Sequence, residues 1–442
     1  MSGKRTVLRS RYVVQSDIIK AASVVVEGEK IVDIADYDAL VDNAEVINID
    51  EDKYLLPGMI DAHVHINEPG RTQWEGFETA TRAGAVGGFT TIIDMPLNSL
   101  PPTTTVAHLE EKKKAALQKI YTDIGFWGGA VPGNCPDMAA LWQEGVFGFK
   151  CFLAESGVDE FQFLNSSCLL AHMEKIKEFD GLLIVHAEDA KILADAPPAG
   201  TSYDSFLQSR PHEAEDKAIA DLIEAVRKTG CKTHILHLSS SWSIDQIRQA
   251  KEEGLPLTVE TCPHYLTFSA ESIPDGRTEF KCCPPLRQEE NREKLWQALL
   301  EGVIDYVASD HSPCTIDLKR LDEGNFATAW GGIASVQLGL STVFTGMTAR
   351  DQGIEKTVDV LCHKPAQVLG IDGKGGIKVG NDADFCVFDP NGTFTVDVNA
   401  LHHKNKISPY NKMTLKGTVH ETYLRGQKVD VDNPHGQFLT RS

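Results

Sequence analysis

The chain has 442 residues, 42% of them hydrophobic, which is enough to fill one large α/β barrel and a smaller module. Its formal net charge of -20, without any basic block, argues against nucleic acid and anionic membranes as partners. No apolar run approaches the roughly 20 residues that a membrane span requires, and residues 1–14 lack a secretory apolar core. We therefore expect a cytoplasmic protein, with a mitochondrial location as the alternative because Arg5, Arg9 and Arg11 lie near the N-terminus.

Strand-like patterns occupy both ends of the chain. Residues 6–50 alternate apolar and polar side chains and include a Gly-containing turn, and similar pieces return at 383–388 and 414–424. Each end alone offers too few strands to be stable, so we expect the two ends to pair in one small β-sandwich. The predicted parts of this sandwich are residues 1–55 and 377–442.

Between these ends lie eight short apolar runs, each ending in polar residues or glycine and separated from the next by an amphipathic stretch. This alternation is typical of β/α units, and eight units predict a closed (β/α)8 barrel of the TIM type over residues 56–376. Helix-like segments at 74–86 and 213–228 end beside Gly87-Gly88 and Gly230, where glycine can form a left-handed cap. The eight runs are 59–66, 89–95, 123–131, 146–153, 181–187, 233–238, 256–261 and 304–309.

The first run ends in two histidines separated by one residue. Side chains alternate faces along a β-strand, so His63 and His65 point the same way and can share a metal ion. The turn residues at 67–70 put the pair at the carboxyl end of its strand, where barrels keep their chemistry. Taken alone, the pair is better explained as an ordinary polar strand end, and only residues downstream favour a metal site.

Those residues end later strands. Lys150 lies inside an apolar strand, where burial lowers the pKa of the amine, although a snorkelling or ion-paired lysine is an equal alternative. His186 ends the fifth run and Asp310 follows the eighth. His234 and His237 face opposite sides of the sixth strand, and His237, nearer the polar end, is the better candidate; His234 is expected to pack in the core.

Candidate ligands thus end strands one, four, five, six and eight, all at the face where barrel enzymes place catalytic groups. This shared position makes coincidence the weaker hypothesis. Nitrogen and oxygen donors without thiolate suit zinc best, and also cobalt, manganese or iron.

The ordered set of motifs resembles the cyclic amidohydrolases of the dihydroorotase, dihydropyrimidinase and allantoinase group. The resemblance implies that carbon dioxide carboxylates Lys150, giving N6-carboxylysine, and that this group bridges two divalent metal ions. It implies His63, His65 and Asp310 on one ion, His186 and His237 on the other, and a homotetramer. The matching motifs are Pro57-Gly58-x-Ile60-Asp61-x-His63-x-His65, Lys150, His186-Ala187-Glu188, His237-Leu238-Ser239-Ser240, Cys262-Pro263-His264-Tyr265-Leu266 and Ser309-Asp310-His311-Ser312-Pro313.

Within this group the sequence is most similar to the allantoinases. Asn67 stands where dihydroorotases have a substrate-binding arginine, and Glu155 stands where dihydropyrimidinases have a tyrosine. Residues 67–77, 156–161 and 329–333 are similar to allantoinase segments. The resemblance implies that allantoin, a small molecule, is hydrolysed to allantoate. Alternatives are hydantoinase, dihydropyrimidinase or dihydroorotase activity, and a non-catalytic scaffold.

In this hypothesis Asp310 is the catalytic residue: it accepts the proton of the attacking water and delivers it to the departing ring nitrogen. The resemblance implies substrate contacts from the main chain around Cys283 and Gly332. Asn67 and His264 are further candidates for substrate binding, although a packing role is at least as good for His264.

Three smaller predictions complete the sequence analysis. Glu68 and Arg71 are expected to pair at the rim of the site. Ser156 is a candidate to replace the missing tyrosine as an oxyanion donor. The ten cysteines lack Cys-x-x-Cys spacing and are expected to be reduced thiols in the core.

Overall fold

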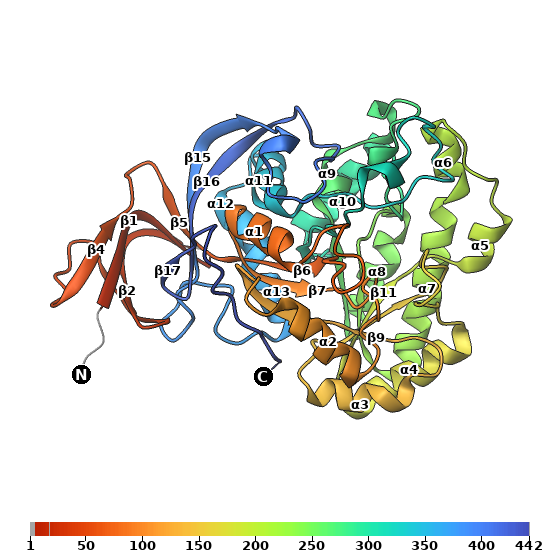
Figure 1. Ribbon diagram of the computed structural model, residues 1–442, viewed down its shortest axis with the longest axis horizontal. Helices are drawn as coiled ribbons and strands as arrows, with labels where there is room; N and C mark the ends of the chain where they lie inside the picture. Colours follow the sequence, from red (N-terminus) through yellow and green to blue (C-terminus); the bar gives the residue numbers. More distant parts are fainter. Residues whose placement is uncertain (1–4, 17, 442) are drawn as a thin grey trace.

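The computed structural model describes residues 5–16 and 18–441, and it places a β-rich part beside a barrel (Figure 1). The β-rich part is one eight-stranded sheet with the order β17-β16-β15-β5-β1-β2-β3, and β4 pairs with β1. Its strands are β1 (Arg5–Gln15), β2 (Ile18–Glu27), β3 (Lys30–Asp36), β4 (Ala44–Asn48), β5 (Tyr54–Pro57), β15 (Phe385–Thr395), β16 (Thr414–Leu424) and β17 (Gln427–Lys428).

Strand β5 joins the strands from the two ends of the chain into one sheet. It pairs in parallel with β1, where Tyr12 lies opposite Tyr54, and antiparallel with β15, where Phe385 lies opposite Pro57. The prediction that both termini build one β-sandwich is therefore confirmed. The predicted boundaries themselves stay a proposal, and residues 1–4, 17 and 442 lie outside the described part of the chain.

The barrel strands run in parallel from β6 to β14. Trp127 lies outside the strands and divides one predicted run into β8 and β9, which pair with β7 and β10 respectively. A parallel bridge between Val64 and His311 closes the barrel. Each of the eight predicted runs overlaps an observed strand. They are β6 (Met59–Val64), β7 (Phe89–Asp94), β8 (Asp123–Phe126), β9 (Gly128–Gly129), β10 (Phe149–Phe152), β11 (Leu182–His186), β12 (Lys232–Ile235), β13 (Leu257–Thr261) and β14 (Tyr306–Val307).

Both predicted helices are present, as α1 and α7. Gly230 ends α7 with a φ of 65° and donates a 2.7 Å hydrogen bond to Val226 O, as expected for a left-handed cap. Helix α1 begins three residues later than predicted, because Gly76 has a φ of 109° that a helix cannot continue.

Thirteen α-helices occur among the described residues, and none of them has the length and apolar character that a bilayer span requires. They are α1 (Phe77–Val86), α2 (Val106–Ala116), α3 (Cys135–Gln143), α4 (Ser166–Glu178), α5 (Ala190–Asp195), α6 (Tyr203–Ser209), α7 (His212–Thr229), α8 (Ile244–Glu252), α9 (Pro263–Thr267), α10 (Glu289–Leu300), α11 (Gly339–Thr348), α12 (Ile354–Val358) and α13 (Lys364–Leu369).

A buried ion cluster centred on Lys374 joins the barrel to the sandwich sheet. Its ammonium lies 2.9 Å from Asp123 of β8, 3.1 Å from Asp382 and 2.7 Å from Asp384, just before β15. Arg425 also donates to Asp123. Burial lowers the pKa of Lys374, but the three carboxylates outweigh burial and raise the pKa above its usual value, so the amine stays charged.

Removing this ammonium would leave buried carboxylates without their counter-ion. We expect Lys374→Ala to lower the free energy of unfolding by about 3 kcal/mol or more. The control is Lys191→Ala, which breaks an exposed pair with Asp195 and should cost less than about 1 kcal/mol. Urea denaturation monitored by circular dichroism measures both, and equal costs would refute a stabilising role for the cluster.

Candidate metal centre

The structure brings the six predicted metal ligands together at the carboxyl ends of the barrel strands. His63 lies within β6, Lys150 lies within β10 and His186 ends β11, while the other three follow β6, β12 and β14 within three residues. All six side chains are buried. They are His63, His65, Lys150, His186, His237 and Asp310.

The distances divide the cluster into two halves. Asp310 Oδ1 lies 3.2 Å from His63 Nε2 and 3.4 Å from His65 Nε2, so one ion could bind all three. The ring of His237 lies 5.4 Å from that of His63 and 4.6 Å from that of His186, measured between centroids. His186 and His237 can therefore serve a neighbouring ion.

Lys150 is 1% exposed, which excludes a lysine that snorkels to solvent. Its Nζ lies 4.8 Å from the centroid of the Phe152 ring, and no described carboxylate lies within 4.0 Å of it. Burial lowers the pKa of Lys150 to about 8, against the opposing effect of Asp310 and Glu260. A neutral amine is the form that can take up carbon dioxide.

His65, His237 and Asp310 have the protonation states that a cation needs. Burial lowers the pKa of His65 to about 4 and that of His237 well below its usual value, so both imidazoles are neutral at pH 7. Burial alone would raise the pKa of Asp310, but His63, His65 and His237 hold it well below its usual range. Asp310 is therefore an ionised carboxylate.

Glu260 of β13 orients His63 from outside the cluster. Its Oε1 lies 2.5 Å from His63 Nδ1, which turns His63 Nε2 toward Asp310. Its Oε2 lies 3.3 Å from His234 Nε2, and His234 stacks on Tyr306 at 5.0 Å. His234 thus packs away from the ligands, as strand alternation predicted, whereas the role of Glu260 was missed because its partners are far away in the sequence.

Glu188 and Arg210 orient His186 in a similar way. Glu188 Oε2 lies 2.6 Å from His186 Nε2, which leaves His186 Nδ1 for a metal. Arg210 donates from Nε to Glu188 Oε1 at 3.0 Å and from Nη2 to Oε2. Glu188 could be noticed in the His-Ala-Glu motif, but nothing local marks Arg210.

The backbone at the cluster adopts conformations that few non-glycine residues adopt. His237 has a φ of 39° and Asp310 a φ of 42°, and such strain gathers at functional sites. Asp61 Oδ1 accepts hydrogen bonds from Ser309 N at 3.1 Å and His63 N at 3.2 Å. Asp61 therefore ties the first strand of the barrel to the segment that carries Asp310.

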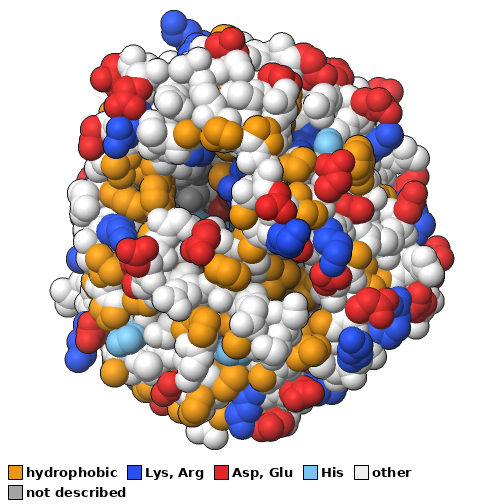
Figure 2. Space-filling model, turned by 90° about the vertical axis from the view of Figure 1, so that its right-hand side faces the viewer, with side chains coloured by type: hydrophobic (Ala, Val, Ile, Leu, Met, Phe, Trp, Pro, Cys, Tyr) orange, Lys and Arg blue, Asp and Glu red, His pale blue; other side chains and the backbone are white. Residues whose placement is uncertain are grey.

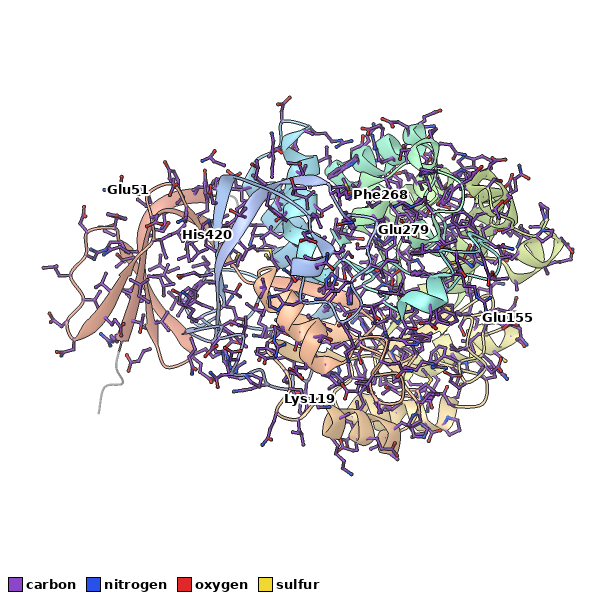
Figure 3. All side chains as sticks on the ribbon, turned by 45° about the horizontal axis from the view of Figure 1, so that its top comes forward. Glu51, Lys119, Glu155, Phe268, Glu279 and His420 are labelled. Carbon is purple, nitrogen blue, oxygen red and sulfur yellow. The ribbon has the colours of Figure 1, made fainter. Side chains whose placement is uncertain are left out.

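A cavity of about 420 Å³ opens above the cluster, within the usual range for small-molecule sites. The barrel face turned away from the sandwich is hollowed (Figure 2). Glu155, which lines the cavity, lies at that end of the molecule, whereas Glu51 and His420 lie in the sandwich at the other end (Figure 3). The predicted ligands that line the cavity are His65, Lys150, His186, His237 and Asp310.

Two of the four predicted substrate-binding residues, Cys283 and Gly332, also line the cavity. Gly332 has a φ of 109°, and a Cβ there would collide with Ser312 O, so only glycine fits. Asn67 and His264 are buried outside the cavity wall, and Asn67 donates to Pro313 O at 3.3 Å. Contacts of these four residues with substrate stay a prediction.

Ser156 also lines the cavity, although its hydroxyl donates to Phe161 O at 2.7 Å. The hydroxyl proton is therefore used within the loop, and the serine is poorly prepared to donate to a substrate oxyanion.

The predicted pair of Glu68 with Arg71 is wrong. Glu68 is buried, lies 2.5 Å from Lys119 and accepts a 2.8 Å hydrogen bond from Phe77 N at the start of α1. Arg71 turns across the rim and lies 2.5 Å from Glu160. The unpaired N–H groups at the start of α1 and the Lys119 ammonium together hold the Glu68 carboxylate. The ten cysteines are all free thiols, as predicted, but only seven of them are buried in the core, while Cys135, Cys168 and Cys283 are partly exposed.

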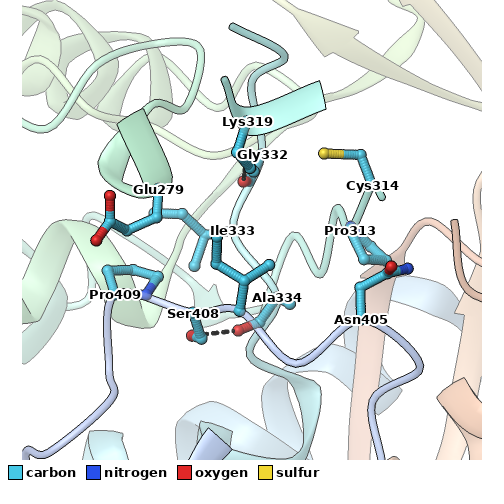
Figure 4. A pocket seen from close by; sticks show the side chains of 11 residues that line it. Glu279, Pro313, Cys314, Lys319, Gly332, Ile333, Ala334, Asn405, Ser408 and Pro409 are labelled. Atoms are coloured by element: carbon cyan, nitrogen blue, oxygen red, sulfur yellow. Dashed lines mark hydrogen bonds between the residues drawn. The ribbon is translucent and has the colours of Figure 1, made fainter. Parts of the chain in front are cut away.

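A second crevice lies beside the cavity wall, where Ser408 donates to Ala334 O at 2.7 Å (Figure 4). Its volume is about 10 Å³, which holds at most one water molecule, so it is no substrate site. Lys319 crosses it to donate to the carbonyls of Trp330 and Gly332, and Lys281 donates to Ala329 O at 2.6 Å. The two lysines thereby hold the wall of the larger cavity.

A β/α barrel with buried histidines, lysine and aspartate at its mouth, and a sandwich built from both termini, defines a hydrolase of the metal-dependent barrel class. Residues 54–429 match the Amidohydrolase family, and the chain belongs to this family. The predicted fold class and family are confirmed.

Known proteins are similar to this chain over all or most of its length. It is 50% identical over 446 residues to an allantoinase of Streptomyces avermitilis, covering 100% of both chains. It is 47% identical over 404 residues to an allantoinase of Saccharomyces cerevisiae, covering 88% of this chain and 86% of that one. The solved L-hydantoinase (dihydropyrimidinase) from Arthrobacter aurescens matches with a TM-score of 0.93 and 30% identity over 100% of both chains.

The position of Glu260 leads to a testable prediction about metal affinity. Because its carboxylate fixes the ring of His63, we expect Glu260→Gln to weaken the affinity for divalent metal by about 10- to 100-fold. Competition with a chelator measures the affinity. Glu155→Gln is the control, since Glu155 lines the same cavity but is exposed and should leave the affinity unchanged. Equal affinity of both variants would exclude the orienting role.

Proposed function

We propose that the protein hydrolyses the cyclic amide of allantoin to allantoate in purine degradation. The observation that carries this proposal is the full-length match to an allantoinase at 50% identity. Two residues add support: Asn67 and Glu155 stand where dihydroorotases and dihydropyrimidinases have their substrate-binding arginine and tyrosine. The cavity size also suits a small ring compound.

We further propose that the site binds two divalent metal ions. Zinc is the first candidate, and cobalt, manganese and iron are alternatives. His63, His65 and Asp310 would hold one ion, and His186 and His237 the other. Lys150, carboxylated by carbon dioxide, would bridge them. The residues fit such ions: His63 Nε2 and His237 Nδ1 are buried nitrogens without a hydrogen-bond partner in the described part of the chain.

When bound, the two cations would lower the pKa of a water molecule and polarise the carbonyl under attack. The protein's own contribution is proton transfer by Asp310, which is ionised and lines the cavity. Asp310 accepts the proton of the attacking water and delivers it to the ring nitrogen. Water thereby adds across the C–N bond, which breaks to give an N–H group and a carboxylic acid, and the acid releases its proton to solvent to become a carboxylate.

A second candidate is hydrolysis of another cyclic amide such as hydantoin, because the solved L-hydantoinase superposes with a TM-score of 0.93. A non-catalytic scaffold is the poorer alternative, since all six candidate ligands are present and buried together.

We also propose, from the family resemblance, that the protein is a homotetramer. Sedimentation velocity can test this oligomeric state. A cytoplasmic location, with the mitochondrion as the alternative, is proposed as well.

The decisive experiment measures hydrolysis of allantoin, hydantoin, dihydrouracil and dihydroorotate before and after chelation and resupply of zinc, manganese or cobalt. We expect the highest kcat/KM for allantoin. We also expect activity to be lost on chelation and to recover with metal, because the proposed reaction depends on the bound cations. A higher kcat/KM for hydantoin would favour the second candidate. Activity that survives complete metal removal would contradict a metal-dependent mechanism.

Asp310→Asn tests the proton-transfer step. Asparagine keeps the shape and can still bind metal at one or both positions, but it cannot accept a proton, so we expect kcat to fall about 10²- to 10⁴-fold. Asp159→Asn, at an exposed rim position, is the control and should keep wild-type turnover. Metal analysis accompanies the assay, and near-normal turnover of the asparagine variant would remove Asp310 from this role.

A further inference from the structure

His264, on α9 directly after β13, is a buried histidine that the proposed mechanism does not use. Its side chain is 0% exposed, and neither Nδ1 nor Nε2 has a hydrogen-bond partner among the described residues. Buried polar groups in native proteins nearly always have a partner. Two unpaired nitrogens on one buried ring therefore point to a ligand that the protein atoms do not supply.

The neighbours of His264 include two further side chains that can bind a metal ion. One ligand atom each from Cys262, His264 and Asp310 lies within 4.8 Å of the other two, and all three side chains are buried. Donors around a tetrahedral zinc ion are separated by about 3.5 Å, given bonds of about 2.3 Å to sulfur and 2.0 Å to nitrogen. Small side-chain rotations would close this triad on one ion.

We propose that Cys262, His264 and Asp310 form an inhibitory site for a third, thiophilic divalent ion such as Zn²⁺ or Cd²⁺. The sulfur, nitrogen and oxygen donors of this triad differ from the nitrogen and oxygen donors of the catalytic centre, and thiolate favours softer cations. As the metal–sulfur bond forms, the Cys262 thiol releases its proton to water. Asp310 is the one residue that both sites share.

Sharing Asp310 explains how the third ion would act. Asp310 lines the cavity, whereas Cys262 and His264 lie outside the cavity wall, so an ion would reach the triad past the Asp310 carboxylate. An ion bound there takes a carboxylate oxygen that is needed to accept the proton. Binding of the ion depends only on the donor geometry, while inhibition rests on the proposed function.

Cys283 is the rival target for a thiophilic ion, because it lines the cavity and is only half-buried. The two thiols can be separated by substitution. Cys262→Ala and Cys262→Ser remove the sulfur donor of the triad, and His264→Gln removes its nitrogen donor. Cys283→Ala tests the rival. Cys386→Ala in β15 is the matched control, since its thiol is equally buried but belongs to the sandwich sheet.

The experiment titrates Cd²⁺ into the full-length protein loaded with two equivalents of zinc. Ultraviolet absorption from thiolate-to-cadmium charge transfer and equilibrium dialysis report binding, and zinc analysis checks that both zinc ions stay. We expect one equivalent of Cd²⁺ to bind with the absorption band and allantoin hydrolysis to fall by about 100-fold, as loss of a proton acceptor predicts.

The variants show which thiol binds the Cd²⁺ ion. The band should vanish in both Cys262 variants, weaken in His264→Gln, and persist in Cys283→Ala and Cys386→Ala. No bound third equivalent, release of zinc, or a band lost only in Cys283→Ala would each overturn the proposal. Binding at Cys262 in a protein that does not hydrolyse allantoin would leave the third site standing and refute the proposed function instead.

Discussion

Desolvation of polar donors at the barrel mouth is the constraint on which the rest of the structure depends. Six potential metal ligands are removed from water together, and burial shifts several of their pKa values toward the neutral form. Burying such a cluster lowers the stability of the folded chain unless a favourable interaction compensates for the lost hydration. The proposed pair of cations would supply that compensation, and the neutral imidazoles of His65 and His237 beside the ionised Asp310 are the states that bind cations.

Buried carboxylates outside the cluster also hold the candidate ligands in position. Glu260 holds His63, Glu188 holds His186, and Asp61 accepts hydrogen bonds from the main chain on two barrel strands. Each of these carboxylates is fully buried and has a nitrogen partner, so its charge orients a ligand. A fixed ring costs less entropy when it binds an ion, because its rotamer is already chosen. The arrangement of the candidate ligands therefore depends on the buried carboxylates that contact them from outside the cluster.

The same aspartate joins the proposed catalytic and inhibitory functions. Asp310 Oδ1 lies 3.2 Å from His63 Nε2, and an Asp310 oxygen lies within 4.8 Å of ligand atoms of Cys262 and His264. Its left-handed backbone conformation, with a φ of 42°, puts the carboxylate at the point where both sets of donors can reach it. Metal supply and turnover would then be coupled through one side chain.

The amino-acid sequence by itself determined the eight strands, the pairing of the termini and the shared face of His63 and His65, because alternation along a strand is a local property. It also marked Lys150 as a lysine inside an apolar run. Only the tertiary structure decided which carboxylate meets which cation: Glu68 meets Lys119, and Arg71 meets Glu160. Likewise, Glu260 meets His63 across 197 residues of sequence. Such contacts depend on the order of strands around the barrel and on side-chain packing, and no local period of the sequence encodes either.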